Sequence, residues 1–289
     1  MAQHDMSPDR VRRLVAQDAR AWGQLGVAWG LRGDASRVPA ASSAPETVQP
    51  EPEPEPEAQP EPVPRNPMKL TQPPTAQVEA KPMPTPTGTP AELAQHQLAQ
   101  ILQDYTEAAP HLVTGTPHTT IVFGEGDPCA RIMFVGEAPG ADEDRLGRPF
   151  VGRAGQKLEQ MIIAMGLQRE DVYIANVLKV RPPNNATPTL EEAQACAPYL
   201  MRQIEVIQPE AIVALGLPSA RLLTQQALSM RDLRGRWWPM ATPSGQEFQV
   251  LPTYHPAYLL RNYTPETRRK VWEDLKCVLE RLQMPVPDR

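Results

Sequence analysis

Short apolar runs recur along the second half of the chain, each bounded by polar or turn-forming residues. Runs of four to eight such residues are typical of buried β-strands, whereas apolar residues spaced three or four apart over longer stretches are typical of helices. The pattern predicts four strands, at residues 130–135, 171–177, 210–215 and 248–254.

Between and around these strands the apolar residues take up helical spacing. Thr189 and Glu192 stand at the positions of a capping box, and the last stretch repeats apolar residues along one face. The predicted helices cover residues 91–105, 155–166, 189–208, 218–228 and 266–282. Alternating strands and helices over this length favour an α/β fold, with three α/β/α layers around a central, mainly parallel four-stranded sheet.

Composition divides the chain into three parts. Residues 37–90 hold 16 of the 35 prolines, and residues 40–64 hold six glutamates without a lysine or arginine. Such a stretch buries too little apolar surface to offset the entropy lost on ordering, so residues 36–88 are predicted to be a disordered Pro/Glu-rich linker. Residues 1–35 are then an N-terminal tail. Residues 89–289 are a domain large enough for one hydrophobic core.

The N-terminal tail has helical spacing of its own, with Val11, Leu14, Val15, Ala19 and Trp22 along one face. We expect a short amphipathic helix there. It could dock on the domain, dimerise or recruit a protein partner, and a weakly ordered tail is an equal alternative.

Charge and cysteine usage narrow the class of protein. Without the six linker glutamates the formal net charge of −5 becomes +1, so the acidic total says little about the domain. No apolar stretch reaches the roughly 20 residues of a transmembrane helix. The three cysteines are too widely spaced for a disulfide framework. These features predict a cytoplasmic protein without a membrane association, and we expect a monomer.

Chemically capable side chains follow three of the four predicted strands. Glu137 opens a loop rich in glycine and proline at 136–155, Asn176 ends the second strand, and His255 follows the fourth. Sites in parallel α/β folds form beyond the carboxyl ends of strands, so these three side chains are predicted to share a pocket. The loop after the third strand, with the sequence LGLPSA, is interpreted as a simple turn.

Four motifs, in order and spacing, resemble those of family 4 uracil-DNA glycosylases, the bacterial and archaeal branch that normally carries an iron–sulfur cluster. The resemblance runs from about Phe123 to the C-terminus. The motifs are GEAPGADEDRLGRPFVGRAG, NVLKVRPPNN, EEAQACAPYL and HPAYLLRN.

The resemblance implies a role for each pocket residue. Phe150 would stack on a uracil flipped out of DNA. Asn176 would pair with uracil O4 and N3, and His255 would hydrogen-bond O2 as charge develops on the leaving base. Glu137 is assigned to positioning water or the loop, so the catalytic set is His255, Glu137 and Asn176. The other expected uracil-binding residues are Gly136, Ala138, Gly140 and Glu143.

Glu143 carries two interpretations, because it could reject the methyl group of thymine or be a solvated loop charge. For DNA contacts, the resemblance implies that Leu259 and Leu260 wedge into the minor groove. About half of five cations are expected to meet phosphates. These cations are Arg148, Arg153, Lys179, Arg181 and Arg261.

The chain departs from the family at the cluster positions. Ala109, Leu112 and Val180 stand where the family has cysteines, and only Cys196 remains. Iron–sulfur clusters require thiolates, so the resemblance implies that the [4Fe–4S] cluster is lost, that no cofactor is needed and that Cys196 is a core residue.

The sequence therefore predicts a monofunctional uracil-DNA glycosylase of base excision repair that acts on single- or double-stranded DNA. One alternative is a non-catalytic or redirected DNA-binding relative with a partner-recruiting N-terminal helix. Another is a glycosylase for a different deaminated base, such as hypoxanthine or xanthine.

Overall fold

The computed structural model describes residues 88–110 and 120–288. The predictions for the N-terminal helix at 1–35 and for nearly all of the linker at 36–88 lie outside these residues. None of the helices within residues 88–110 and 120–288 combines the length and the hydrophobicity of a membrane-spanning segment.

A six-stranded sheet forms the centre of the domain, in the order β1-β3-β2-β4-β6-β5. Its four inner strands are mutually parallel and are the four that the apolar runs predict. They are β2 (Ile132–Gly136), β3 (Tyr173–Asn176), β4 (Ala211–Leu215) and β6 (Glu247–Thr253). Residues of β2, β3 and β4 are buried throughout, which explains why these strands are continuous apolar runs in the sequence.

Two edge strands, both antiparallel to their neighbours, were not predicted. β1 (Glu125–Gly126) has only two residues and pairs with β3, while β5 (Trp238–Ala241) pairs with β6. β1 is too short to form a pattern, whereas β5 was missed although residues 237–241 are apolar throughout. β5 contains Pro239, which is tolerated on an edge where no ladder hydrogen bond is needed.

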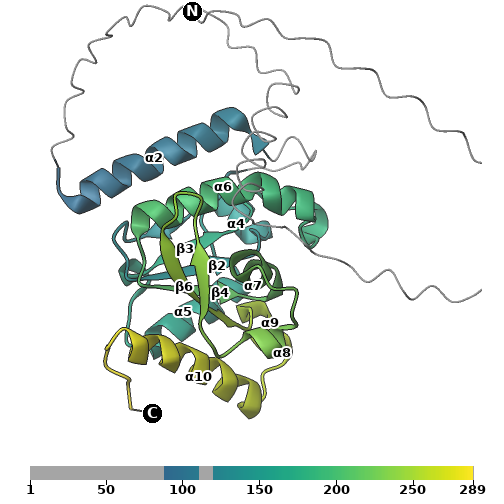
Figure 1. Cartoon of the computed structure of the whole chain (residues 1–289). Helices are drawn as coiled ribbons and strands as arrows, with labels where there is room; N and C mark the ends of the chain where they lie inside the picture. Colours follow the sequence, from purple (N-terminus) through teal and green to yellow (C-terminus); the bar gives the residue numbers. More distant parts are fainter. Residues whose placement is uncertain (1–87, 111–119, 289) are drawn as a thin grey trace, which may run out of the picture. The chain divides into compact units, whose positions relative to one another are not determined.

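Helices cover both faces of the sheet, as the three-layer prediction requires (Figure 1). One face carries α2 (Pro90–Ala108), α6 (Leu190–Ile207), α7 (Leu217–Thr224) and α8 (Met230–Leu233). The other carries α5 (Arg153–Ala164), α9 (Pro256–Arg261) and α10 (Pro265–Arg281). The capping box is confirmed, since the Thr189 hydroxyl accepts from the Glu192 amide and the Glu192 carboxylate accepts from the Thr189 amide.

The side chains of β2 alternate between the two faces of the sheet and so contribute to the hydrophobic core on each face. Met133 and Val135 pack with α2 and α6, whereas Ile132 and Phe134 pack with α5 and α10. Successive side chains of a strand point to opposite faces, so one short apolar run contributes to two hydrophobic layers.

The segment at 136–155, which was predicted to be a loop, contains a short helix, α4 (Ala141–Leu146). Gly147 ends it in a left-handed conformation that glycine adopts without strain. Two short 3₁₀ turns, η1 (Arg169–Asp171) and η2 (Pro183–Asn185), complete the elements around the sheet.

Candidate active site

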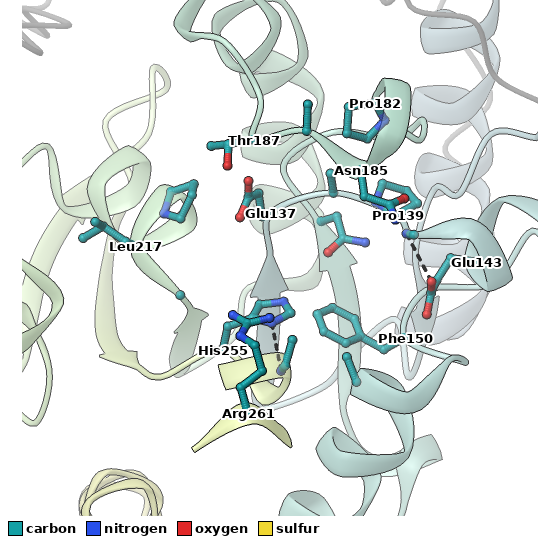
Figure 2. Close-up of a pocket in the computed structure, with 18 residues that line it drawn as sticks. Glu137, Pro139, Glu143, Phe150, Pro182, Asn185, Thr187, Leu217, His255 and Arg261 are labelled. Atoms are coloured by element: carbon teal, nitrogen blue, oxygen red, sulfur yellow. Dashed lines mark hydrogen bonds between the residues drawn. The ribbon is translucent and has the colours of Figure 1, made fainter. Parts of the chain in front are cut away.

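A cavity of about 570 Å³ opens at the carboxyl ends of the parallel strands. Glu137, Asn176 and His255 all line it, so the structure brings together the three side chains that the sequence predicted to share a pocket (Figure 2). Phe150, Ala138, Gly140 and Glu143 line the same cavity. Gly136 lies directly beneath it, paired with Asn176 across β2 and β3.

Asn176 presents a buried acceptor that has no partner. The residue is 1% exposed, and its Oδ1 is the one buried side-chain atom without a hydrogen bond among the described residues. Leaving a buried polar group unpaired typically costs about 1–3 kcal/mol. Because Asn176 lines the cavity, its unpaired oxygen indicates a ligand that brings a donor.

Gly136 allows the side chains above it to converge. A Cβ atom at this position would lie 2.3 Å from Asn176 Oδ1 and 2.5 Å from Phe150 Cζ, closer than any real contact. The glycine is therefore required by close approach, because any larger residue would push the amide and the aromatic ring apart.

Phe150 and His255 form two sides of the cavity. Their ring centroids lie 5.7 Å apart with an interplanar angle of 34°. Phe150 is 6% exposed and has a left-handed backbone, with φ of 51°, which is unusual for a residue with a side chain. The geometry leaves the ring as an apolar surface beside the polar edge of Asn176.

His255 is held as a neutral imidazole. Its Nδ1 accepts a hydrogen bond of 3.1 Å from the Ala257 amide at the start of α9, which places the ring proton on Nε2. Burial, followed by the positive charge of Arg261, lowers the pKa of His255 to about 4. At neutral pH the side chain can therefore donate one hydrogen bond without carrying charge.

Glu137 lies directly after β2 and lines the cavity together with Thr187 (Figure 2). Burial raises the pKa of its carboxyl group. A carboxylate with a raised pKa is a stronger base than one in water, which suits a group that orients or activates water.

Glu143 is not a solvated loop charge, which corrects one of its two interpretations. The residue is 9% exposed, and its carboxylate accepts hydrogen bonds from the amides of Gly140, Val151 and Gly152 at 3.1, 2.8 and 2.8 Å. It thus joins the start of α4 to the segment that carries Phe150, while still lining the cavity.

Lys179 cannot contact DNA, so its assignment as a phosphate ligand is wrong. The side chain is fully buried, and its Nζ donates to the Asn176 carbonyl at 2.7 Å and to Gln203 Oε1 at 2.5 Å. Burial lowers the pKa of Lys179 to about 7. Lys179 stabilises the position of Asn176 through the hydrogen bond to its backbone carbonyl.

The other cations predicted to bind DNA have accessible side chains. Arg148 forms two hydrogen bonds with Glu125, and Arg181 donates to Asn185. Arg153 and Arg261 are exposed and line a smaller hollow beside the main cavity, and Arg261 lines both. Of these four cations, Arg261 is therefore the one whose side chain lines the candidate site.

Leu259 and Leu260 lie on α9 rather than in a loop, and they differ in exposure. Leu259 is 3% exposed and belongs to the core shared with α5 and α10, whereas Leu260 is 42% exposed. The prediction that Leu259 wedges into DNA is wrong because this side chain is part of the core. Leu260 is exposed, so the prediction that it wedges into DNA still stands as a prediction.

Around Cys196 the structure shows a packed core. Cys196 is 2% exposed, as predicted for a core residue, and its Sγ lies 3.8 Å from the Tyr105 hydroxyl. Val180 is 1% exposed and Ala109 ends α2, while Leu112 lies outside the described residues. Side chains of alanine and valine offer no ligand for iron, so the described positions do not fit a [4Fe–4S] cluster.

The segment after β4, which the sequence analysis interpreted as a simple turn, is the start of α7 and belongs to the cavity. Gly216, Leu217 and Pro218 line it, and Gly216 has φ of 90°. A Cβ at Gly216 would lie 3.0 Å from the Cβ of His255. The glycine in LGLPSA was the available signal. Further lining residues that were not singled out are Ala154, Pro139, Pro182, Asn185, Ala186, Thr187 and Ala257.

Comparison with known proteins places this fold and site in a family. Residues 123–276 match the model of the Uracil DNA glycosylase superfamily, and the chain belongs to that superfamily. It is 50% identical over 159 residues to a Type-4 uracil-DNA glycosylase of Thermotoga maritima, covering 55% of this chain and 81% of that protein.

Two further relatives show where the chain stands within the superfamily. A Type-4 uracil-DNA glycosylase of Sulfurisphaera tokodaii is 47% identical over 167 residues, which is 56% of this chain and 74% of that protein. A Type-5 uracil-DNA glycosylase of Pyrobaculum aerophilum is 34% identical over 171 residues, which is 54% of this chain and 72% of that protein. The similarity is thus greater to the type-4 branch.

Proposed function

We propose that this protein is a monofunctional uracil-DNA glycosylase of base excision repair, which hydrolyses the N-glycosidic bond of a flipped uracil and leaves an abasic site. One observation carries the proposal: Asn176, whose buried Oδ1 has no hydrogen-bond partner, lines a cavity together with an aromatic ring and a neutral imidazole. Membership of the superfamily and 45–50% identity to several Type-4 enzymes support it.

The edge of uracil fits the unsatisfied amide. Uracil carries a hydrogen on N3 and a carbonyl oxygen at position 4, so Asn176 Oδ1 can accept from N3 while Nδ2 donates to O4. Cytosine has an acceptor at N3 and an amino group at position 4, and both would face the wrong atom of this amide. The ring of Phe150 would hold the extruded base by stacking.

Bond cleavage leaves negative charge on the uracil ring. His255 Nε2–H can donate to O2 as that charge develops, and the imidazole stays neutral because burial and Arg261 lower its pKa. Arg261 lines the same cavity, so its positive charge also favours the departing anion. Glu137 is proposed to orient the water that attacks the sugar.

The proposed reaction uses no metal. Among residues 88–110 and 120–288 no three His, Cys, Asp or Glu side chains are grouped to hold a metal ion. The proposal that the cluster is lost rests on the alanine and valine at two cluster positions, because neither side chain can bind iron. Stacking, edge recognition and charge stabilisation depend only on this chain's own side chains.

The test is to incubate the purified full chain with single-stranded and duplex DNA carrying one uracil, followed by alkaline cleavage at abasic sites. Uracil DNA should be cut, and matched thymine and cytosine DNA should not. Cleavage of hypoxanthine or xanthine DNA alone would identify another base as the substrate. Tight binding without abasic sites would indicate a DNA-binding relative and contradict the enzyme assignment.

Finer features of the protein are also proposed. We infer a monomer that acts in the cytoplasm, which the three free cysteines support because reduced thiols suit a reducing compartment. The N-terminal segment is proposed to recruit a protein partner across the Pro/Glu-rich linker. Limited proteolysis should cut first within residues 36–88 and leave a fragment beginning near residue 89, and a resistant N-terminal part would contradict this organisation.

A further inference from the structure

The backbone at Phe150 needs support from its surroundings. Phe150 follows Pro149 and adopts a left-handed conformation, with φ of 51°. This region is unfavourable for a residue with a Cβ atom, because the side chain approaches the neighbouring carbonyl oxygen. A non-glycine residue persists there only when other contacts determine the path of the chain.

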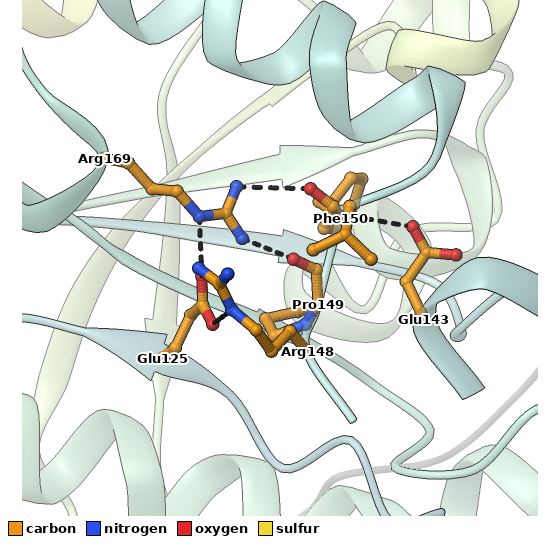
Figure 3. A network of polar contacts seen from close by, with 7 residues as sticks. Glu125, Glu143, Arg148, Pro149, Phe150 and Arg169 are labelled. Carbon is orange, nitrogen blue, oxygen red and sulfur yellow. Dashed lines mark hydrogen bonds and ion pairs between the residues drawn. The ribbon is translucent and has the colours of Figure 1, made fainter. Parts of the chain in front are cut away.

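Two charged side chains, Arg169 and Glu143, hold residues 149–152 by hydrogen bonds to their backbone (Figure 3). Arg169 donates from Nη1 to the Phe150 carbonyl at 3.2 Å and from Nη2 to the Pro149 carbonyl. Glu143 accepts from the amides of Val151 and Gly152, both at 2.8 Å. Every backbone group that these four contacts engage lies within residues 149–152, so they define the course of the chain through Phe150.

Arg169 is itself held in place by Glu125. Its Nε donates to Glu125 Oε1 at 2.6 Å, and the arginine side chain is only 14% exposed. Burial alone would raise the pKa of Glu125, but hydrogen bonds from Arg148 and Arg169 lower it, so the carboxylate is charged at neutral pH. The three donors of one rigid guanidinium thus bridge a fixed anion to two carbonyls, which a lysine cannot reproduce.

The helix behind the segment gives the carbonyl no alternative position. A Cβ atom at Gly155 would lie 1.9 Å from the Phe150 carbonyl oxygen, so the backbone of α5 passes directly against it. With α5 on one side and Arg169 on the other, a shift of this carbonyl would have to break the arginine contact.

We infer that Arg169 is a positioning residue for Phe150. Through the carbonyls of Pro149 and Phe150 it holds the left-handed backbone that directs the ring into the cavity, although it does not line the cavity itself. This inference rests on the proposed function, because it treats Phe150 as the surface on which the extruded base stacks.

A double-mutant cycle tests the inference with the full-length protein. Single-turnover excision of uracil is measured for wild type, Arg169→Met, Phe150→Ala and the double variant. Each single variant should be at least about 10-fold slower, and the double variant should be no more than about twofold slower than Phe150→Ala, since two residues acting through one contact are not additive. The Kd for abasic-site DNA should be unchanged in Arg169→Met. The inference would be overturned if the rate reductions of the two single variants multiplied in the double variant. It would also be overturned if Arg169→Met excised uracil at the wild-type rate.

Arg131→Met is the matched control for loss of a bridging arginine. Arg131 pairs with Glu210 and donates to the Leu282 carbonyl, so it also links a carboxylate to the backbone, and it does not line the cavity. The excision rate of Arg131→Met should equal that of wild type.

A second variant, Arg169→Lys, provides the test if Arg169→Met does not fold. It keeps the positive charge beside Glu125, so its Tm should be near that of wild type while its excision rate still falls. A wild-type rate in Arg169→Lys would argue against the two-carbonyl contact.

Hydrogen exchange separates this inference from the proposed function. In the Arg169 variants the amides of Val151 and Gly152 should exchange at least about 10-fold faster, with exchange in α10 unchanged. A wild-type protein that releases no uracil would refute the proposed function, whereas the exchange result would still decide whether Arg169 holds the segment. Unchanged exchange at these two amides would refute the positioning role.

Discussion

The carbonyl oxygen of Asn176 accepts a hydrogen bond of 2.7 Å from the ammonium group of Lys179, which lies wholly inside the protein. The same ammonium group donates to Gln203 Oε1, and Gln203 Nε2 donates to the Phe123 carbonyl. A continuous polar connection therefore runs from α6 to the strand end that presents Asn176. Its charge is costly to bury, since burial lowers the pKa of Lys179 to about 7.

This lysine should make stability depend on pH. Between pH 7 and about 9.5 the unfolded chain, with a lysine pKa near 10.4, binds a proton that the folded protein has released. The free energy of unfolding of wild type should therefore rise with pH relative to Lys179→Met, by up to about 1.4 kcal/mol per pH unit. Urea denaturation at several pH values measures this difference, and parallel curves for the two proteins would contradict it.

Removing the amide of Asn176 should reduce excision while affecting stability little. Asn176→Ala is expected to lose about 1–3 kcal/mol of transition-state stabilisation, because N3 and O4 of the buried base are left unmatched. The free energy of unfolding should change far less, since the Oδ1 atom that is removed has no partner in the described structure. Single-turnover kinetics and urea denaturation measure the two effects, and an unchanged rate would refute the base-reading role.

His255 should act as a neutral donor over the whole physiological pH range. With a pKa of about 4, its protonation should not produce a limb near pH 6.5 in the pH–rate profile. His255→Ala should slow excision by about 100- to 1,000-fold, as expected when a donor to developing negative charge is removed. Single-turnover rates from pH 4.5 to 8 provide the test, and a His255-dependent limb near pH 6.5 would show a charged imidazole.

The same shift has a consequence for stability. The folded pKa of His255 lies below the unfolded value, so as pH falls from about 6.5 towards 4 the unfolded chain binds the proton first and wild type loses stability. His255→Ala should not show this loss. Urea denaturation of both proteins at pH 4.5 and 7 measures it, and an equal decrease in both would contradict the lowered pKa.

The two leucines of α9 should separate stability from DNA engagement. Leu259→Ala should destabilise the protein by about 2–5 kcal/mol, because it leaves a cavity in the core. Leu260→Ala should change stability little but slow excision from duplex DNA more than from single strands, because only a duplex leaves a gap to be filled. Equal rates for wild type and Leu260→Ala on both substrates would refute the wedge.

The proposed loss of the cluster gives a prediction about the iron content and the stability of the protein. Protein purified without oxygen should contain neither stoichiometric iron nor acid-labile sulfide, and excision should survive chelators. Cys196→Ala should cost about 1 kcal/mol of stability and little activity, because Cys196 packs against Tyr105 in the core. Elemental analysis and urea denaturation provide the tests. Bound iron that depends on Cys196 would show that other residues complete a cluster.

The sequence by itself determined the parts of this protein that depend on local periodicity. Three of the four inner strands, β2, β3 and β4, are buried throughout and are visible apolar runs, and β6 is buried from Val250 to Thr253. The helices around them have one apolar face each. The alternation of these elements then placed Glu137, Asn176 and His255 at one edge of a parallel sheet.

Only the tertiary structure decided which polar and apolar side chains are inside. Lys179 resembles a surface cation in the sequence, yet it is buried because α6 supplies Gln203 from 24 residues further along the chain. Leu259 and Leu260 are equivalent in the sequence, but the packing of α9 on α5 buries the first alone. Arg169 reaches the carbonyls of Pro149 and Phe150 through a contact that no local pattern encodes. Such contacts join residues distant along the chain, and they exist only once the sheet has brought those residues together.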